Sequence, residues 1–320
     1  MMPWVLSGLG LVILLLAGDS LVRGAVNLSL RLGVPALIVS LTIVAFGTSA
    51  PELLISIRAV LDNAPGIALG NVVGSNTANI LLVLGIPAIL ARMHTSECDS
   101  RKSYVFMLAA SVLFIALAML GTFTLWAGLV LLAVLVLVLW DQMRDALSHR
   151  RNGAKEIEVE DLLEALEDAD PDMPFWRIGI YTGLGLIGLP LGANLLVENA
   201  TVIAQTYGVS DTAIGLTLVA LGTSLPELAT TVMAALRRQA DVALGNVIGS
   251  NMFNLLAIIG IATLFGPIPV DPEFLRFDLW VMLGASLLLV PFVFFRSDIT
   301  RLWGFGLSAL YIAYIAAVLM

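Results

Sequence analysis

Three side chains in the first half of the chain could together bind a cation: Thr48, Ser49 and Glu52. Spacings of four and three residues place both hydroxyls on the carboxylate's face of a helix. Pro51 lacks an N–H and its ring clashes with the carbonyl four residues back, so a helix through Gly47 should break here. The segment therefore predicts one space lined by hydroxyl, carbonyl and carboxylate oxygens.

The same residue types recur 175 positions later. GTSAPEL at 47–53 returns as GTSLPEL at 222–228, and ALGNVVGSNTAN at 68–79 returns as ALGNVIGSNMFN at 243–254. The longer pair matches at nine of 12 positions, which indicates an internal duplication. The second half repeats the first arrangement with Gly222, Thr223, Ser224, Pro226 and Glu227.

The longer motif adds serine and amide oxygens. A serine and an asparagine lie four residues apart on one helical face in each copy, as Ser75 with Asn79 and Ser250 with Asn254. Asn76 and Asn251 follow the serines by one residue and so point about 100° away. For these two asparagines we expect helix packing or backbone capping.

Glu52 and Glu227 fall within apolar segments, where an ionised carboxylate costs about 2.5–3.5 kcal/mol at the bilayer centre. The nearest basic residues, Arg58, Arg237 and Arg238, lie toward the helix ends. A mobile cation is therefore the natural counter-charge, and a structural pair of protonated glutamates is the alternative. The ligand set is all oxygen, which suits Ca²⁺ and Na⁺ and does not suit zinc or copper.

The elements that position these residues must lie in a bilayer. The 320 residues are 59% hydrophobic and 12% charged, with a mean hydropathy of +0.98, whereas soluble domains carry about 25% charged residues. No basic run suits nucleic acid. Apolar windows predict ten spans, at about 3–22, 35–57, 66–91, 103–120, 123–142, 176–197, 211–235, 242–266, 277–295 and 302–319.

The charged residues predict the orientation. Of the 16 Lys and Arg residues, only Arg58 and Arg276 fall in loops after even-numbered spans. Basic residues accumulate in cytoplasmic loops, so both termini should lie outside the cell. The segment 156–172 holds nine of the 24 acidic residues and should then be cytoplasmic. These features predict an integral protein of the plasma membrane or bacterial inner membrane.

Each half contains five predicted spans, an odd number, so the second copy should enter the membrane upside down. The predicted fold is all-α, with ten transmembrane helices as two inverted five-helix repeats and breaks in helices 2, 3, 7 and 8. Residues 1–142 form the first repeat, 143–175 an acidic cytoplasmic linker and 176–320 the second repeat. Inverted repeats are typical of secondary transporters that bind substrate near the midplane.

Residues outside these motifs suggest ordinary roles. Cys98 is expected to be an inert loop thiol, and His94 and His149 to be solvated. Asp19 and Arg23 are spaced to pair near the end of the first helix. No cofactor and no obligatory protein partner is evident.

At the two repeated motifs the sequence resembles the sodium/calcium exchangers of the cation/calcium antiporter superfamily, which carry G-T-S-x-P-E and G-N-x-x-G-S-N motifs. The resemblance implies that Glu52 and Glu227 bind Ca²⁺ with the backbone carbonyls of Thr48 and Thr223. It implies that Asn79 and Asn254 complete this site. It also implies that flanking Na⁺ sites are lined by Ser49, Ser224, Ser75, Ser250, Ala45 and Ala220.

One position departs from part of that family. Some members have a carboxylate where this chain has Asn254, so here two acids remain, and their charge is balanced by one Ca²⁺, two Na⁺ or two protons. The resulting hypothesis is alternating-access exchange of Ca²⁺ for two or three Na⁺. A Ca²⁺/H⁺ antiporter is the alternative and a cation channel is less favoured. An enzyme is disfavoured because the sequence has no HExxH and no Ser/His or Cys/His constellation.

Overall fold

Helices make up almost all of the computed structural model, which describes residues 2–151, 170–208, 220–272 and 274–319. The described elements up to the linker are α1 (Met2–Leu32), α2 (Ala36–Val39), η1 (Ser40–Val44), α3 (Ala45–Thr48), α4 (Ala50–Leu61), α5 (Pro65–Ala78), η2 (Asn79–Val83), α6 (Gly85–Leu90), η3 (Thr95–Glu97), α7 (Arg101–Ala118), β1 (Thr122–Phe123) and α8 (Leu125–Arg151). Those after it are α10 (Phe175–Thr206), α12 (Ala220–Thr223), α13 (Leu225–Leu236), α14 (Ala240–Met252), η5 (Phe253–Ile258), α15 (Ile259–Ala262), β2 (Ile268–Pro269), η6 (Phe274–Asp278), α16 (Leu279–Leu287), α17 (Val290–Phe294) and α18 (Arg301–Leu319). The strands β1 and β2 pair antiparallel, with Thr122 opposite Pro269.

Eight helices in the described ranges are long and apolar enough to cross a membrane, and the bent pair Ala36–Thr48 and Ala50–Leu61 would make a ninth. Leu225–Leu236 is a shorter apolar helix that overlaps the predicted span 211–235. Residues 211–219 of that span, and most of the acidic segment 156–172, lie outside the described residues. The protein is therefore an all-α membrane protein, while the count of ten spans stays a prediction.

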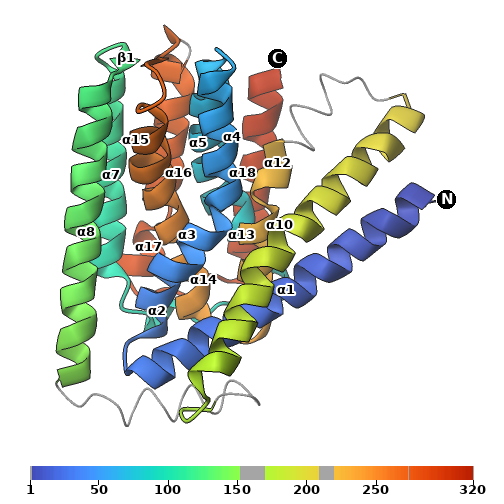
Figure 1. Ribbon diagram of the computed structural model, residues 1–320, viewed down its shortest axis with the longest axis vertical. Coiled ribbons are helices and arrows are strands. Elements are labelled where there is room, and N and C mark those ends of the chain that lie inside the picture. Colours follow the sequence, from blue (N-terminus) through green and yellow to red (C-terminus); the bar gives the residue numbers. More distant parts are fainter. Residues whose placement is uncertain (1, 152–169, 209–219, 273, 320) are drawn as a thin grey trace.

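The helices α1 and α10 lie side by side and tilt away from the other helices (Figure 1). Both are longer than the predicted 3–22 and 176–197. In α1 the charge of Arg23 does not end the helix, because arginine is a good helix former; its Nε donates to Asp19 Oδ2 at 3.0 Å, one turn earlier. The two backbones touch: a Cβ added at Gly10 would lie 2.7 Å from the amide nitrogen of Leu196.

The segment formed by α14, η5 and α15 is the most buried part of the bundle. The most apolar stretch within Ala240–Ala262 is entirely buried, whereas that of α18 is 17% buried. At the lipid-facing surface, large apolar side chains are exposed, and so are the tryptophans near helix ends, Trp140, Trp176, Trp280 and Trp303. The helix that carries Asn254 is thus enclosed by other helices.

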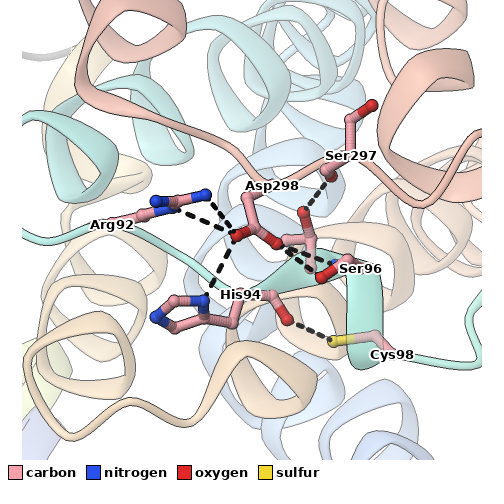
Figure 2. A network of polar contacts seen from close by, with 7 residues as sticks. Arg92, His94, Ser96, Cys98, Ser297 and Asp298 are labelled. Carbon is pink, nitrogen blue, oxygen red and sulfur yellow. Dashed lines mark hydrogen bonds and ion pairs between the residues drawn. The ribbon is translucent and has the colours of Figure 1, made fainter.

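Two loops at one end of the bundle are joined around Asp298 (Figure 2). The loop before α7 meets the loop after α17 through an antiparallel bridge between Met93 and Ile299. Asp298 accepts from Ser96 Oγ at 2.7 Å and lies 2.9 Å from Arg92 Nη2 and 3.2 Å from His94 Nδ1. Burial alone would raise the pKa of Asp298. The hydrogen bonds from Ser96 and the charges of His94 and Arg92 outweigh burial, so the pKa of Asp298 is lowered.

The two histidines and the single cysteine can be compared with the predictions made for them. His94 is 48% exposed, as expected for a loop histidine, and it also contacts Asp298. The side chain of His149 lies outside the described residues. Cys98 is buried, and this burial, followed by the charge of Asp241, raises the pKa of its thiol, which agrees with the expectation of an inert thiol.

Candidate cation site

The helix that carries Glu52 is interrupted at Ser49. The α3 helix ends at Thr48, Ser49 has φ −83° and ψ 4°, and the helical segments on either side are bent by 43°. The second copy has the same conformation, with φ −87° and ψ 4° at Ser224 between α12 and α13. Each proline occupies the first turn after the break, where its missing N–H costs nothing. The breaks predicted at the two GTSxPE motifs are confirmed.

The other two predicted breaks are π-helical turns. The η2 turn begins at Asn79, and the η5 turn begins at Phe253 and contains Asn254. A π turn widens the helix without ending it, and such turns often occur at functional sites. The chain therefore stays helical at both places, which corrects the expectation of broken helices there.

The two predicted carboxylates both lie inside the bundle, where Glu52 and Glu227 are each 1% exposed. Ser49 Oγ donates to Glu227 Oε1 at 3.2 Å, so the break in the first half reaches the carboxylate of the second half. The Oε2 atom of each glutamate is buried without a hydrogen-bond partner among the described residues.

The predicted amides contribute further buried oxygens. Asn79 and Asn254 are each 1% exposed. Asn79 Nδ2 donates to Asn251 Oδ1 at 3.0 Å, which leaves Asn79 Oδ1 as an acceptor. Within the described part of the chain, neither Asn79 Oδ1 nor Asn254 Oδ1 has a hydrogen-bond partner.

The hydroxyls of the first motif also face the second half. Thr48 Oγ1 lies 3.3 Å from the carbonyl oxygen of Ala45, 3.3 Å from Asn246 Oδ1 and 3.5 Å from Ser250 Oγ. All four residues are buried. The two repeated motifs therefore form one continuous polar region.

The remaining predicted site residues come from the equivalent positions of the two halves. Ser75 and Ser224 are 5% and 3% exposed, and Ser224 Oγ has no partner among the described residues. Thr223 ends α12, one residue before the break. Ala220 begins α12, but its side chain lies outside the described residues.

Asn76 and Asn251 behave as the helical geometry predicts. Asn76 Nδ2 donates to the carbonyl oxygen of Asn251 at 3.2 Å, and Asn251 Nδ2 donates to that of Asn76 at 3.3 Å. The two bonds are reciprocal and join α5 to α14. Both asparagines thus tie the backbones of the two halves together.

The sequence reasoning missed two asparagines that hold the glutamate helices. Asn71 Nδ2 donates to the carbonyl oxygen of Glu52 at 3.1 Å, and Asn246 Nδ2 donates to that of Glu227 at 3.3 Å. Both belong to the repeated GNVxGSN segment, and recurrence was the only signal that could have found them.

Several buried oxygen atoms of the site have no hydrogen-bond donor among the described residues, and a bound cation would satisfy them. The unpartnered atoms named above are Glu52 Oε2, Glu227 Oε2, Asn79 Oδ1, Asn254 Oδ1 and Ser224 Oγ. A buried acceptor without a partner costs about 1–3 kcal/mol. In the described ranges no Lys, Arg or His pairs with either glutamate, and no three His, Cys, Asp or Glu side chains form a metal-binding group. Oxygen ligands of this kind suit Ca²⁺ and Na⁺.

Comparison with known proteins points in the same direction. The family model described as sodium/calcium exchanger protein matches residues 2–143 and 178–320. A putative antiporter of Alkalimonas amylolytica is 35% identical over 288 residues, which cover 88% of this chain and 86% of that protein. The sodium/calcium exchanger MaX1 of Methanosarcina acetivorans is 34% identical, and the alignment covers 97% of this chain and 96% of that one.

A solved structure is similar along the whole length. The sodium-calcium exchanger NCX_Mj, soaked with Na⁺ and Ca²⁺, superposes with a TM-score of 0.83 at 32% sequence identity. The superposition covers 100% of this chain and 99% of that chain.

Proposed function

The chain belongs to the sodium/calcium exchanger protein family, and we propose that it exchanges Na⁺ for Ca²⁺ across a cell membrane. Membership makes it an integral membrane transporter of the cation antiporter class rather than an enzyme. The observation that carries the ion assignment is the group of buried carboxylate and amide oxygens without hydrogen-bond partners among the described residues.

In this proposal Glu52 and Glu227 bind Ca²⁺ together with the backbone carbonyls of Thr48 and Thr223. Asn79 and Asn254 complete the coordination. The flanking Na⁺ sites are lined by Ser49, Ser224, Ser75, Ser250, Ala45 and Ala220. Na⁺ and Ca²⁺ compete for the same oxygens, so the binding of one expels the other.

We propose that ten helices form two inverted repeats, residues 1–142 and 176–320, joined by the acidic linker 143–175. Both termini lie outside the cell and the linker is cytoplasmic, which the distribution of Lys and Arg supports. Contacts that recur at the same sequence offset, such as those of Asn71 and Asn246, support a repeated architecture. Alternating access of the central site to the two sides then drives exchange.

One observation also fits a second function, that of a Ca²⁺/H⁺ antiporter. Because position 254 carries an amide, the two glutamates supply two negative charges, which two protons neutralise as well as two Na⁺ do. The purified protein in sealed vesicles distinguishes the two functions. Ca²⁺ uptake driven by an imposed Na⁺ gradient is expected; uptake driven only by a pH gradient would replace Na⁺ with H⁺ as the coupling ion.

The glutamates are tested by Glu52→Gln and Glu227→Gln. Each substitution removes one of the two negative charges from the buried site, so Na⁺-driven ⁴⁵Ca²⁺ uptake should fall more than about tenfold. Glu97→Gln is the matched control, because Glu97 is exposed in a loop and should keep wild-type uptake. Near-wild-type uptake by either buried variant, at equal protein in the vesicles, would contradict the assigned role.

A further inference from the structure

Each glutamate helix is held by a single amide group on the following helix. Asn71 Nδ2 donates at 3.1 Å to the carbonyl oxygen of Glu52 and at 3.0 Å to Ser56 Oγ, one turn further along α4. The Ser56 side chain is completely buried. One NH₂ group, with its two donor hydrogens, therefore bridges two successive turns of the helix that presents Glu52.

The second half repeats this arrangement. Asn246 Nδ2 donates at 3.3 Å to the carbonyl oxygen of Glu227 and at 3.1 Å to Thr231 Oγ1. Each donor and acceptor lies 175 residues after its counterpart, and a serine hydroxyl is replaced by a threonine hydroxyl with the same hydrogen-bonding capacity. The same three-residue contact has thus been kept at both sites, although the side chain of its acceptor differs.

The position of the bridge matters for the geometry of the site. Polar residues with four-residue spacing lie on the packed helices α4 and α5, namely Glu52 and Ser56 on α4 and Asn71 and Ser75 on α5, with Asn79 one turn beyond Ser75. The bridge joins the members nearest to the turn between α4 and α5. The bridge therefore fixes the position of the Glu52 turn along the axis of α5, and with it the axial distance between Glu52 and Asn79.

We propose that Asn71 and Asn246 are positioning residues that set the depth of Glu52 and Glu227 relative to the amide and serine oxygens of the cation site. This inference rests on the proposed function, because it assumes that the glutamates bind the transported ions. A shift of one residue along a helix moves a side chain by 1.5 Å, and Ca²⁺ ligands lie within a narrow range of 2.3–2.6 Å. A small displacement of the glutamate turn would therefore weaken binding.

Asn246 also connects the two halves. Its Oδ1 atom lies 3.3 Å from Thr48 Oγ1, while its Nδ2 atom holds the glutamate of its own half. One amide thus relates the broken turn of the first half to the carboxylate of the second. The asparagine side chain suits this role because its oxygen accepts while its nitrogen donates.

The test measures affinity separately from maximal rate in reconstituted vesicles. For Asn71→Ala and Asn246→Ala, we expect the Ca²⁺ concentration that gives half-maximal Na⁺-driven uptake to rise about tenfold, as for other residues that orient metal ligands. Ser56→Ala and Thr231→Val each remove one of the two bonds that the asparagine donates, and Thr231→Val also removes the bond from Thr231 Oγ1 to the Glu227 carbonyl oxygen at 2.7 Å. Both variants keep the bond from the asparagine to the glutamate carbonyl and should give smaller rises in the same direction. These milder variants keep the test available if an asparagine variant does not fold.

The control is Asn27→Ala, which removes another fully buried asparagine whose amide donates to the Arg23 carbonyl within α1. It should leave the half-maximal Ca²⁺ concentration unchanged. A purely structural role predicts a lower maximal rate and lower thermal stability with unchanged Ca²⁺ affinity in all four test variants, and this result would overturn the inference. If the wild type shows no Na⁺-driven uptake, the proposed function fails instead, so the two failures are distinct.

Discussion

At the scale of single residues, the turns that follow the two glutamate helices share one unusual backbone conformation. Asn63 and Arg238, at equivalent positions of the two halves, both have φ of 57°. In each turn the next residue's amide bonds back to the helix, from Ala64 to Ala59 and from Gln239 to Ala234. Asparagine adopts this left-handed conformation at little energetic cost, whereas arginine adopts it only with backbone strain.

This difference predicts that Arg238→Asn stabilises the protein. The substitution removes backbone strain at an exposed position, so the free energy of unfolding should rise by about 0.5–1 kcal/mol. Thermal unfolding of the purified protein in detergent measures the change. The reverse substitution, Asn63→Arg, should lower the free energy of unfolding by a similar amount. If neither substitution changes the free energy of unfolding, the backbone at this position is not strained.

The burial of the candidate site residues was predictable because they are polar residues that recur within apolar segments, whereas their binding of cations stays a prediction. The oxygens of Glu52, Glu227, Asn79 and Asn254 could be identified because they lie in apolar segments and recur. The contacts of Asn71 were not predictable, because a sequence shows that an amide is present but not which carbonyl it meets across a helix hairpin. Arg237 was likewise assigned to a helix end without its partner Asp19.

At the scale of elements, helix type was easier to predict than helix ends. The charged Arg23 marked the expected end of the first span, but a charged residue ends an apolar stretch and not a helix, and α1 continues to Leu32. The π turns at Asn79 and Phe253 have no recognisable sequence signature, because a single extra residue in a helical turn changes the geometry of the helix and not its residue types. The predicted proline-associated breaks were correct since proline removes a specific hydrogen bond.

The loop junction around Asp298 predicts a pH-dependent contribution to stability. A carboxyl group whose pKa is lowered on folding contributes stability above its ordinary pKa of about 4, and this contribution is lost as pH falls through the lowered value. Asp298→Asn should therefore lower the melting temperature at pH 7. The difference from wild type should shrink below about pH 4.

A melting-temperature difference that stays constant between pH 7 and pH 3 would rule out this charge effect. Asp99→Asn is a suitable control, because Asp99 is exposed in the adjoining loop before α7 and forms no ion pair with the described residues. It should show little difference from wild type at either pH.

At the scale of the whole molecule, the two halves differ in how they hold the tilted pair of helices. Asp19 of α1 accepts from Arg23 and also pairs with Arg237, which follows α13. The equivalent positions of the other half carry Asn194, Glu198 and Asp62, a set with no cation. The ion pair therefore fastens α1 to the bundle at only one of the two related places.

A double-mutant cycle with Asp19→Asn and Arg237→Gln tests this fastening. Both side chains are mostly buried, at 17% and 19% exposure, so each single substitution should cost about 1–2 kcal/mol of stability. The double variant should be no less stable than the worse single variant, because the interaction is lost only once. Additive losses would mean that the two residues act independently.

The touching backbones of α1 and α10 leave no room for a larger side chain at Gly10. A Cβ there would lie 2.7 Å from the amide nitrogen of Leu196 and 2.9 Å from the carbonyl oxygen of Gly192, so a substitution would have to push the two helices apart. Two helices packed this closely are expected to move as one unit in any conformational change.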